Sequence, residues 1–315
     1  MSRLFDITIN RRKLLTSAAV VGAGALALAN TQCDPALVRR VHQIEGRRDP
    51  RHAVWVWQFS EDGTADEIAA TLAANNLAAI VKTHDGVEWM ANFDHVPGAI
   101  DGPAQVGTIA GIFESYGVPF HAWCVVKGVD PVREAEMAAA VLANGARSLT
   151  LDLEDHPGFW EGTRVSAAIF GAELRARNAF ARVDVSVDPR PWLNLRLPID
   201  EFVHVTDGIR PQLYWDLFQG VDQRNAWAYM GYPAVEGVTP EFLVDASIRM
   251  FAAHDRWLLP IAHASPGDGA SFARFAHRAW QHQMPELSVW RYAIADTALL
   301  DYLRRNPPGA EPSGV

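Results

Sequence analysis

Short apolar runs alternate with longer amphipathic stretches from residue 52 to the C-terminus. Eight runs rich in β-branched or aromatic residues predict strands, at 53–59, 77–83, 119–126, 148–154, 182–187, 209–215, 257–263 and 287–292. Each run is followed by a helical pattern or by a loop that leads to one. The clearest helical patterns open with the Asp, Thr or Pro residues that start helices, at 64–76, 130–145, 268–283 and 296–306.

Eight strand and helix units in about 255 residues are the count and length of a (β/α)8 TIM barrel. A doubly wound open sheet also alternates strands with helices and is the alternative, although it needs no eighth strand. The pattern divides the chain into a signal segment (1–29), a leader (30–51), the barrel (52–306) and a tail (307–315).

The first segment has the organisation of an export signal. Arg11 and Arg12 precede an apolar stretch over 16–29 that is too short for an ordinary membrane span, and this resembles a twin-arginine (Tat) signal. Cleavage is expected near Asn30, which predicts a periplasmic or extracellular protein. An uncleaved membrane anchor, or a lipid attached at Cys33, are the alternatives.

Charge and composition indicate which classes of ligand the protein could bind. The chain has a net charge of -9, and its first 29 residues carry four positive and one negative side chain, so the remainder stands at -12. Such an acidic surface repels phosphate backbones, which argues against nucleic acid as a partner. Eleven tryptophans against six tyrosines favour a carbohydrate ligand, because the indole offers a flat apolar face with a polar edge. The sequence has no glycine-rich phosphate loop, and neither a cofactor nor a metal is expected.

The strongest candidate chemistry lies at the end of the fourth predicted strand. Barrel active sites form at the carboxyl ends of the strands. In the sequence LTLDLED, Asp152 and Glu154 are two residues apart in a strand and therefore point to the same side. Two neighbouring carboxylates repel each other, so one should hold a proton near neutral pH and serve as a general acid. The alternative is a purely stabilising ring in which the carboxylates pair with Lys82 and Arg291.

Short motifs at the strand ends resemble those of two glycosidase families. The segments VKTHDG (81–86), LDLE (151–154) and VWRY (289–292) resemble motifs on strands two, four and eight of glycoside hydrolase family 25, the lysozyme-like muramidases. More loosely, LDLE resembles the acidic Asp-x-Glu of family 18, and QLYWD (212–216) is similar to the sixth-strand region of that family. The resemblance implies a barrel that cleaves glycosidic bonds.

The resemblance also implies residue roles. Glu154 would be the acid, while Asp152 would orient it or stabilise a substrate-derived intermediate. Tyr214 or Asp188 would contribute a polar group from the opposite wall.

Two departures from the family patterns leave this mechanism incomplete. Trp55 and Trp57 stand where family 25 carries a catalytic Asp on the first strand. Thr150 stands where family 18 has a further Asp before its Asp-x-Glu. No separate nucleophile can therefore be identified from the sequence.

Polar and aromatic side chains at other strand ends are expected to bind substrate. They are Gln58, Lys82, Asp85, Trp123, Gln212, Trp215, Trp290 and Arg291. The long stretch 216–238 after the sixth strand carries Trp227 and Tyr229 near glycines, and is expected to be a lid that lays aromatic area over a bound sugar. Alternatively, a short helix there packs on the neighbouring unit.

Three functions remain open. The leading one is an exported glycosidase that cleaves a polysaccharide or cell-wall glycan, preferably a neutral or weakly charged one, by carboxylate acid/base catalysis. The missing first-strand acid leaves room for a catalytically silent carbohydrate-binding barrel. The third is a metal-dependent barrel hydrolase or lyase, in which His84, His121 and His263 would join Asp152 around an ion.

Overall fold

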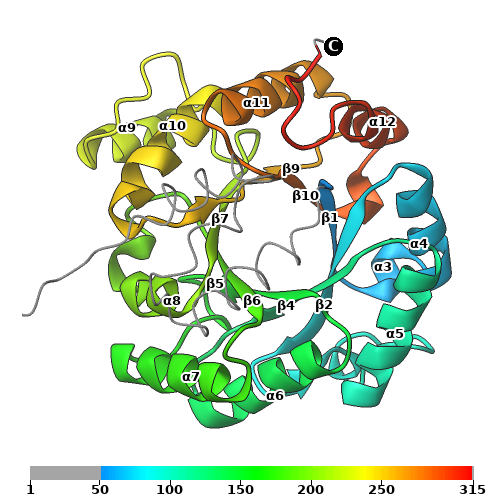
Figure 1. The fold of residues 1–315 in the computed structure, drawn as a ribbon. Coiled ribbons are helices and arrows are strands. Elements are labelled where there is room, and N and C mark those ends of the chain that lie inside the picture. Colours follow the sequence, from blue (N-terminus) through cyan, green and yellow to red (C-terminus); the bar gives the residue numbers. More distant parts are fainter. Residues whose placement is uncertain (1–50, 314–315) are drawn as a thin grey trace, which may run out of the picture.

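Residues 51–313 are described by the computed structural model, in which eight parallel strand positions form a barrel inside a ring of helices (Figure 1). The signal segment and nearly all of the leader lie outside the described residues. The barrel strands are β1 (Ala53–Val56), β2 (Ala78–Asp85), β4 (Phe120–Val125), β5 (Ser148–Leu153), β6 (Arg182–Val187), β7 (Gly208–Leu213), β9 (Ile261–His263) and β10 (Ser288–Trp290). Two short strands join them, β3 (Glu88–Trp89) beside β2 and β8 (Trp257–Leu258) beside β7.

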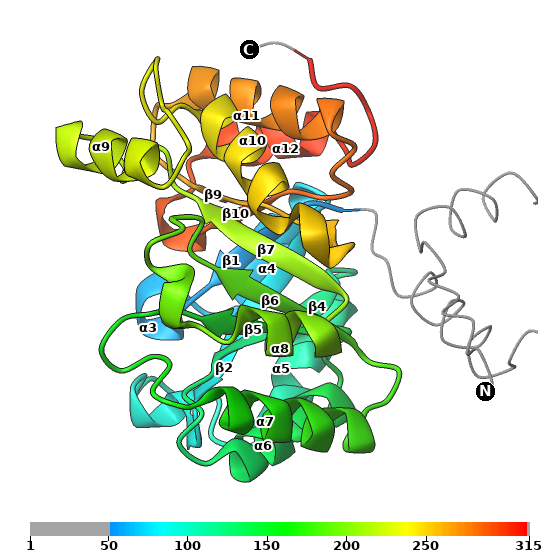
Figure 2. The ribbon, with the colours of Figure 1, turned by 90° about the vertical axis from the view of Figure 1, so that its left-hand side faces the viewer.

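Helices follow the strands in turn. Their bounds are α3 (Phe59–Asp62), α4 (Ala65–Ala74), α5 (Pro103–Ser115), α6 (Pro131–Ala143), α7 (Arg164–Arg177), α8 (Ile199–Val205), α9 (Val221–Tyr229), α10 (Pro240–Phe251), α11 (Gly269–Gln281) and α12 (Thr297–Arg305). Figure 2 shows α9 projecting at the left, beyond the helices of the ring. Within the described residues, no helix has both the length and the apolar character that a membrane span requires.

The sheet closes on itself. Ala53 of β1 is in register with Ala78 of β2 on one side and with Ser288 of β10 on the other, and all barrel pairings are parallel. An open sheet would leave β1 and β10 as unpaired edges. The predicted (β/α)8 barrel is therefore confirmed, and the alternative of a doubly wound open sheet is wrong.

Alternation along each strand separates two cores. On β6, Val183 and Val185 belong to the apolar layer between strands and helices, whereas Arg182, Asp184 and Ser186 are the alternate residues, which face the barrel interior. A second, smaller apolar cluster inside the barrel consists of Ala53, Trp55, Ala78, Ile80, Trp123, Val125 and Ile261.

The seventh strand position is interrupted. The predicted strand at 257–263 is built as β8 and β9, with Pro260 between them. Proline has no backbone N–H to give to a ladder. Its carbonyl still accepts a hydrogen bond from the Ser288 N–H at 3.0 Å, which keeps β10 in place.

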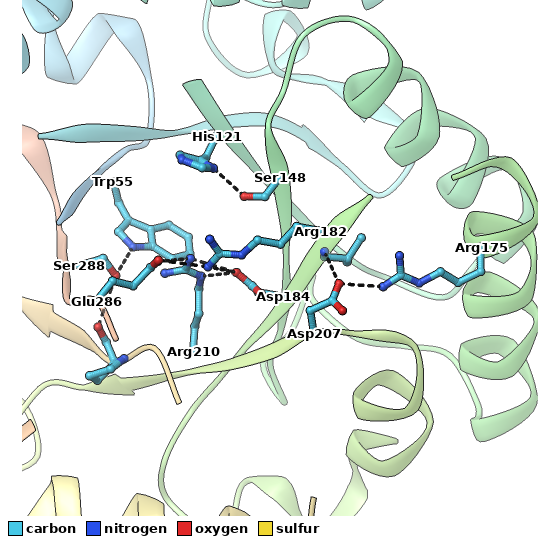
Figure 3. A network of polar contacts seen from close by, with 12 residues as sticks. Trp55, His121, Ser148, Arg175, Arg182, Asp184, Asp207, Arg210, Glu286 and Ser288 are labelled. Carbon is cyan, nitrogen blue, oxygen red and sulfur yellow. Dashed lines mark hydrogen bonds and ion pairs between the residues drawn. The ribbon is translucent and has the colours of Figure 1, made fainter. Parts of the chain in front are cut away.

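Four charged side chains fill the barrel interior away from its mouth (Figure 3). Arg210 donates to Asp184 at 3.1 Å and to Glu286 at 2.6 Å, and Arg182 reaches the same two carboxylates at 3.1 and 3.2 Å. Burial alone would raise the pKa of Glu286, but the two guanidinium groups hold it near 2. Gly208 leaves the room that this network needs, because a Cβ there would stand 2.8 Å from Asp184 Oδ1.

Candidate active site

Two carboxylates meet at the end of β5. Asp152 is the last inward residue of the strand and is 6% exposed, and Glu154 follows directly after the strand with a 15% exposed side chain. The Gln212 side-chain amide, from β7, donates to Asp152 Oδ1 at 3.2 Å and to Glu154 Oε1 at 2.7 Å. Its third contact is the Ser186 hydroxyl at 3.1 Å. One amide therefore joins both acids across the barrel mouth.

Burial decides the protonation of this pair. It raises the pKa of Asp152 well above its usual value, and the neighbouring charge of Glu154 adds to the effect. It also raises the pKa of Glu154, although the hydrogen bond from Gln212 works in the opposite direction. The pair thus keeps a proton to a higher pH than solvated carboxyls would.

The next two strands around the barrel, β6 and β7, add an ion pair and a phenol to the mouth, so Asp188 and Tyr214 lie beside the acid pair and not on the opposite wall. Arg190 donates from its Nε to both carboxylate oxygens of Asp188, at 2.9 and 3.0 Å, so this acid is neutralised in place. Burial, and then the charges of Glu154 and Asp152, raise the pKa of Tyr214 well above its usual value. Tyr214 therefore keeps its proton and remains a hydrogen-bond donor.

Lys82 and Arg291 have partners of their own. Lys82 Nζ lies 3.0 Å from Asp85 Oδ1 and 4.9 Å from the centre of the Trp123 ring. Arg291 lies 4.8 Å above the Trp57 ring. Its guanidinium stands 3.5 Å from the carboxylates of Glu61 and Asp62. Lys82 and Arg291 thus form their ion pairs with Asp85, Glu61 and Asp62, so the alternative in which they close a stabilising ring with Asp152 and Glu154 is wrong. The charge of Lys82 still acts on Asp152 and lowers its pKa, against the larger effect of burial.

Aromatic rings line the mouth at two depths. Trp55 and Trp123 are buried, and Trp290 contacts both edge-to-face, with ring centres 5.4 to 6.0 Å apart across the three. Trp290 is itself partly exposed, and three further partly exposed rings pack on the interior apolar cluster beside it: Trp57, Phe159 and Tyr214. The partly exposed rings are the apolar surface that a sugar could contact.

Three tryptophans that were expected to contact sugar do not line the mouth. Trp215 points away from the mouth: it is 4% exposed, packs on Phe275, and donates its indole N–H to Asp268 at 2.8 Å. Trp123 is 2% exposed beneath Lys82, so it belongs to the barrel core. Trp227 is fully buried, so the prediction that it covers a bound sugar as part of a lid is wrong. Tyr229, two residues later, is 91% exposed.

Gln58 and Asp85 stay at the rim. Gln58 directly precedes α3 after the end of β1 and is half-buried, and Asp85 ends β2.

Two residues of the mouth, Ser186 and Phe159, were not predicted from the sequence. Ser186 could have been found, because it lies two residues before Asp188 on a strand with clear alternation, whereas Phe159 lies in a loop without any periodic signal.

The three histidines considered for a metal lie apart. Burial lowers the pKa of His84 to about 3 and that of His121 to about 3. His121 contacts Ser148 at 2.7 Å, and His263 contacts Asp216 at 2.6 Å. Over residues 51–313, no three His, Cys, Asp or Glu side chains are grouped as a metal would require. The structure therefore offers no support for the metal-dependent alternative.

Comparison with known proteins finds structures of similar fold but no match to the sequence. No protein-family model matches the chain, and no curated protein matches it. Among solved structures, the chain is similar to a glycoside hydrolase family 18 N-acetylglucosaminidase from Paenibacillus barengoltzii, with a TM-score of 0.55, 10% identity, and coverage of 80% of this chain and 98% of that one. It is also similar to the chitinase ICChI from Ipomoea carnea, with a TM-score of 0.51, 10% identity and the same coverage. At this identity the likeness establishes the barrel fold.

Proposed function

We propose that the protein is a glycoside hydrolase in which Glu154 is the general acid. The observation that carries the proposal is the acid pair itself: Asp152 and Glu154 share the Gln212 amide at the barrel mouth, and burial raises the pKa of both carboxyls. A carboxyl whose pKa is raised holds its proton to a higher pH than a solvated carboxyl does, and it can give that proton to a glycosidic oxygen as the bond breaks. The solved glycosidases that share this fold support a function in the cleavage of glycosidic bonds.

The ion pair between Asp188 and Arg190 affects which group could act as the nucleophile in the proposed mechanism. A carboxylate neutralised by a guanidinium is a poor nucleophile, and Asp152 lies only two residues before the acid, on the same side of the mouth. The resemblance of LDLE to the Asp-x-Glu of family 18 implies that the substrate's own 2-acetamido oxygen attacks the anomeric carbon, while Glu154 gives its proton to the leaving oxygen. Asp152 then stabilises the cationic ring intermediate. Water opens this ring after losing a proton to the Glu154 carboxylate.

This mechanism defines the substrate class as a glycan with N-acetylated amino sugars. The Paenibacillus barengoltzii protein is described as an N-acetylglucosaminidase, which supports that choice. The net charge of -12 after residue 29 favours a neutral chain over an anionic cell wall, because long-range repulsion slows approach to the latter.

The test is hydrolysis of chito-oligosaccharides by the purified protein. Glu154→Gln is expected to lower kcat/KM at least a thousandfold, whereas Glu161→Gln, at an exposed position in the loop after the acid, leaves it unchanged. Full activity in the Glu154→Gln protein would remove Glu154 as the acid.

A second candidate is a carbohydrate-binding barrel without turnover. It is favoured by the same Asp188 and Arg190 pair, because no free carboxylate has been identified opposite Glu154. This candidate predicts saturable glycan binding without products, and equal affinity in the wild type and the Glu154→Gln protein.

Export through the Tat pathway to the periplasm or beyond is part of the proposal. It rests on Arg11 and Arg12 before the apolar stretch. Replacing both arginines with lysine should retain the precursor in the cytoplasm, and fractionation with an antibody against the barrel measures this. Unchanged export would refute the Tat assignment.

A further inference from the structure

A cavity of about 330 Å³ lies beside the mouth, between the loop after β9 and the first turn of α12. Its apolar walls are Trp215, Phe272 and Tyr302. This volume is at the lower end of the range for ligand pockets and can hold a single sugar residue. The machinery proposed for bond cleavage uses none of these three residues.

Polar groups line the other side of the cavity. Asp268 precedes α11 but does not cap it, because its carboxylate accepts the Trp215 indole N–H. Asp296 caps α12 at the Leu299 N–H, 2.8 Å away, and also accepts the Gly267 N–H at 3.2 Å. Both carboxylates are therefore held in fixed positions on the lining of the cavity.

His263 connects this cavity with the proposed active site. The residue ends β9 and lines the cavity, and its ring centre is 5.7 Å from that of Tyr214. Burial would raise the pKa of Asp216, but hydrogen bonds from His263 and Ser265 outweigh it and hold that pKa below its usual value. The resulting carboxylate fixes the imidazole ring by its contact with Nδ1 at 2.6 Å.

The groups on the lining indicate which ligand the cavity would hold. Fixed carboxylates and the Ser265 hydroxyl accept or share hydrogen bonds with hydroxyl groups. The apolar part of the lining, where Ala298 and Leu299 are less buried than the aromatic walls, can contact the C–H groups of a sugar ring. An anion would meet Asp268 and Asp296, with Arg305 as the fixed positive charge on the lining. A neutral sugar fits both the polarity and the size.

We propose that this cavity is a subsite for one neutral sugar residue of the glycan that occupies the mouth. The location of the scissile bond at Glu154 rests on the function proposed above, whereas occupancy of the cavity by a sugar can be tested without it. The subsite would make longer substrates bind more tightly while leaving the chemical step unchanged, because the contacts made there are equal in the ground and transition states.

Two exposed alanines on the cavity lining allow it to be blocked without touching the catalytic machinery. Ala270 and Ala298 are the second residues of α11 and α12. Phenylalanine at either position should fill the cavity. Ala104, also exposed and the second residue of α5, gives a matched control for the substitution itself, because none of the described cavities is lined by it.

The kinetic experiment compares chito-oligosaccharides of two and six residues. Ala298→Phe and Ala270→Phe should raise KM for the hexasaccharide at least tenfold, with kcat unchanged and less than a twofold effect on the disaccharide. Ala104→Phe should behave as the wild type. If the cavity variants match Ala104→Phe on the hexasaccharide, the subsite is refuted while the hydrolase function stands.

A binding experiment separates the two proposals. N-acetylglucosamine is titrated into the full-length Glu154→Gln protein, alone and with Ala298→Phe, and the indole signal of Trp215 is followed by NMR. Saturable shifts that Ala298→Phe abolishes support the subsite, even if the wild type cleaves no glycan. Shifts at Trp215 with tetramethylammonium but none with the sugar would overturn it in favour of a cation pocket.

Discussion

Gln212 reaches across the barrel mouth from β7 and places its amide nitrogen 2.7 Å from Oε1 of Glu154. The same nitrogen also lies within hydrogen-bond distance of Asp152 and Ser186, so two N–H groups serve three oxygens. This amide thus donates to both acids, and its hydrogen bond lowers the pKa of Glu154, which stabilises the charged form of that carboxyl.

Replacing Gln212 with methionine tests this arrangement. Loss of the donor should raise the pKa of Glu154, because the hydrogen bond from Gln212 lowers it. The alkaline limb of the pH profile of kcat/KM should therefore move to higher pH, and the optimum rate should fall about tenfold, or about 1.4 kcal/mol. Gln105→Met, which removes a hydrogen bond to the Gly98 carbonyl on the surface, is the control. An alkaline limb that stays in place would show that Gln212 does not tune the acid.

The raised pKa of Asp152 carries a cost in stability. A carboxyl whose pKa is higher in the folded state contributes its full stability below its unfolded pKa, and that contribution is lost as the pH rises through the folded value. Asp152→Asn cannot ionise, so it should exceed the wild type in melting temperature by a few degrees at pH 8, with the difference shrinking toward pH 4. Melting curves from pH 4 to pH 8 measure this. Asp101→Asn, at an exposed loop position, should show no such trend.

The strands were predictable because two faces of each strand are buried differently. On β6, the sequence RVDVSV alternates strictly, since valines must fill the layer beneath the helices while polar residues face the interior. The same alternation placed Asp152 and Glu154 together. It also made the full set of eight strand positions visible without any comparison.

What alternation could not show is which interior groups pair. Lys82 binds Asp85 three residues later, where the register between β2 and β4 is irregular, and the sequence has no signal for that irregularity. Phe159 comes from a loop whose course depends on tertiary contacts. Trp227 was misplaced because its segment has too weak a helical pattern to reveal that one side is buried.

The network of buried charges inside the barrel should make stability sensitive to the loss of a single carboxylate (Figure 3). Glu286→Gln would leave Arg182 and Arg210 with Asp184 as their one remaining carboxylate in the network, so the free energy of unfolding should fall by about 3–5 kcal/mol. The control is Glu241→Gln, which breaks a surface pair with Arg274 and should cost less than about 1 kcal/mol.

The effect of Glu286 also depends on pH. Its pKa near 2 lies below the unfolded value, so its stabilisation is complete above that unfolded value and is lost as the pH falls toward 2. The difference between wild type and Glu286→Gln in urea unfolding should therefore shrink on acidification. A constant difference from pH 7 to pH 3 would mean that the charge of Glu286 is not what stabilises the barrel.

The two aromatic side chains of α9 should differ in how much they contribute to stability. Trp227 is fully buried and contacts the rings of Trp192, Tyr232 and Phe242 with centres 5.1 to 5.8 Å apart, whereas Tyr229 is 91% exposed. Trp227→Ala should therefore lower the free energy of unfolding by about 3–5 kcal/mol. Tyr229→Ala should change it by less than about 0.5 kcal/mol.

A third variant distinguishes lost packing from a lost hydrogen bond. The Trp227 indole N–H is buried and has no hydrogen-bond partner among the residues that the structure describes, so phenylalanine would remove an unsatisfied donor while keeping most of the apolar contact. Trp227→Phe should therefore cost about 1 kcal/mol, well below the alanine variant. Urea unfolding of the three variants measures the order, with glycan turnover followed on the folded fraction. If Trp227→Ala kept its stability but lost affinity for glycan, Trp227 would have to lie on the substrate surface and the packing of α9 described above would be wrong.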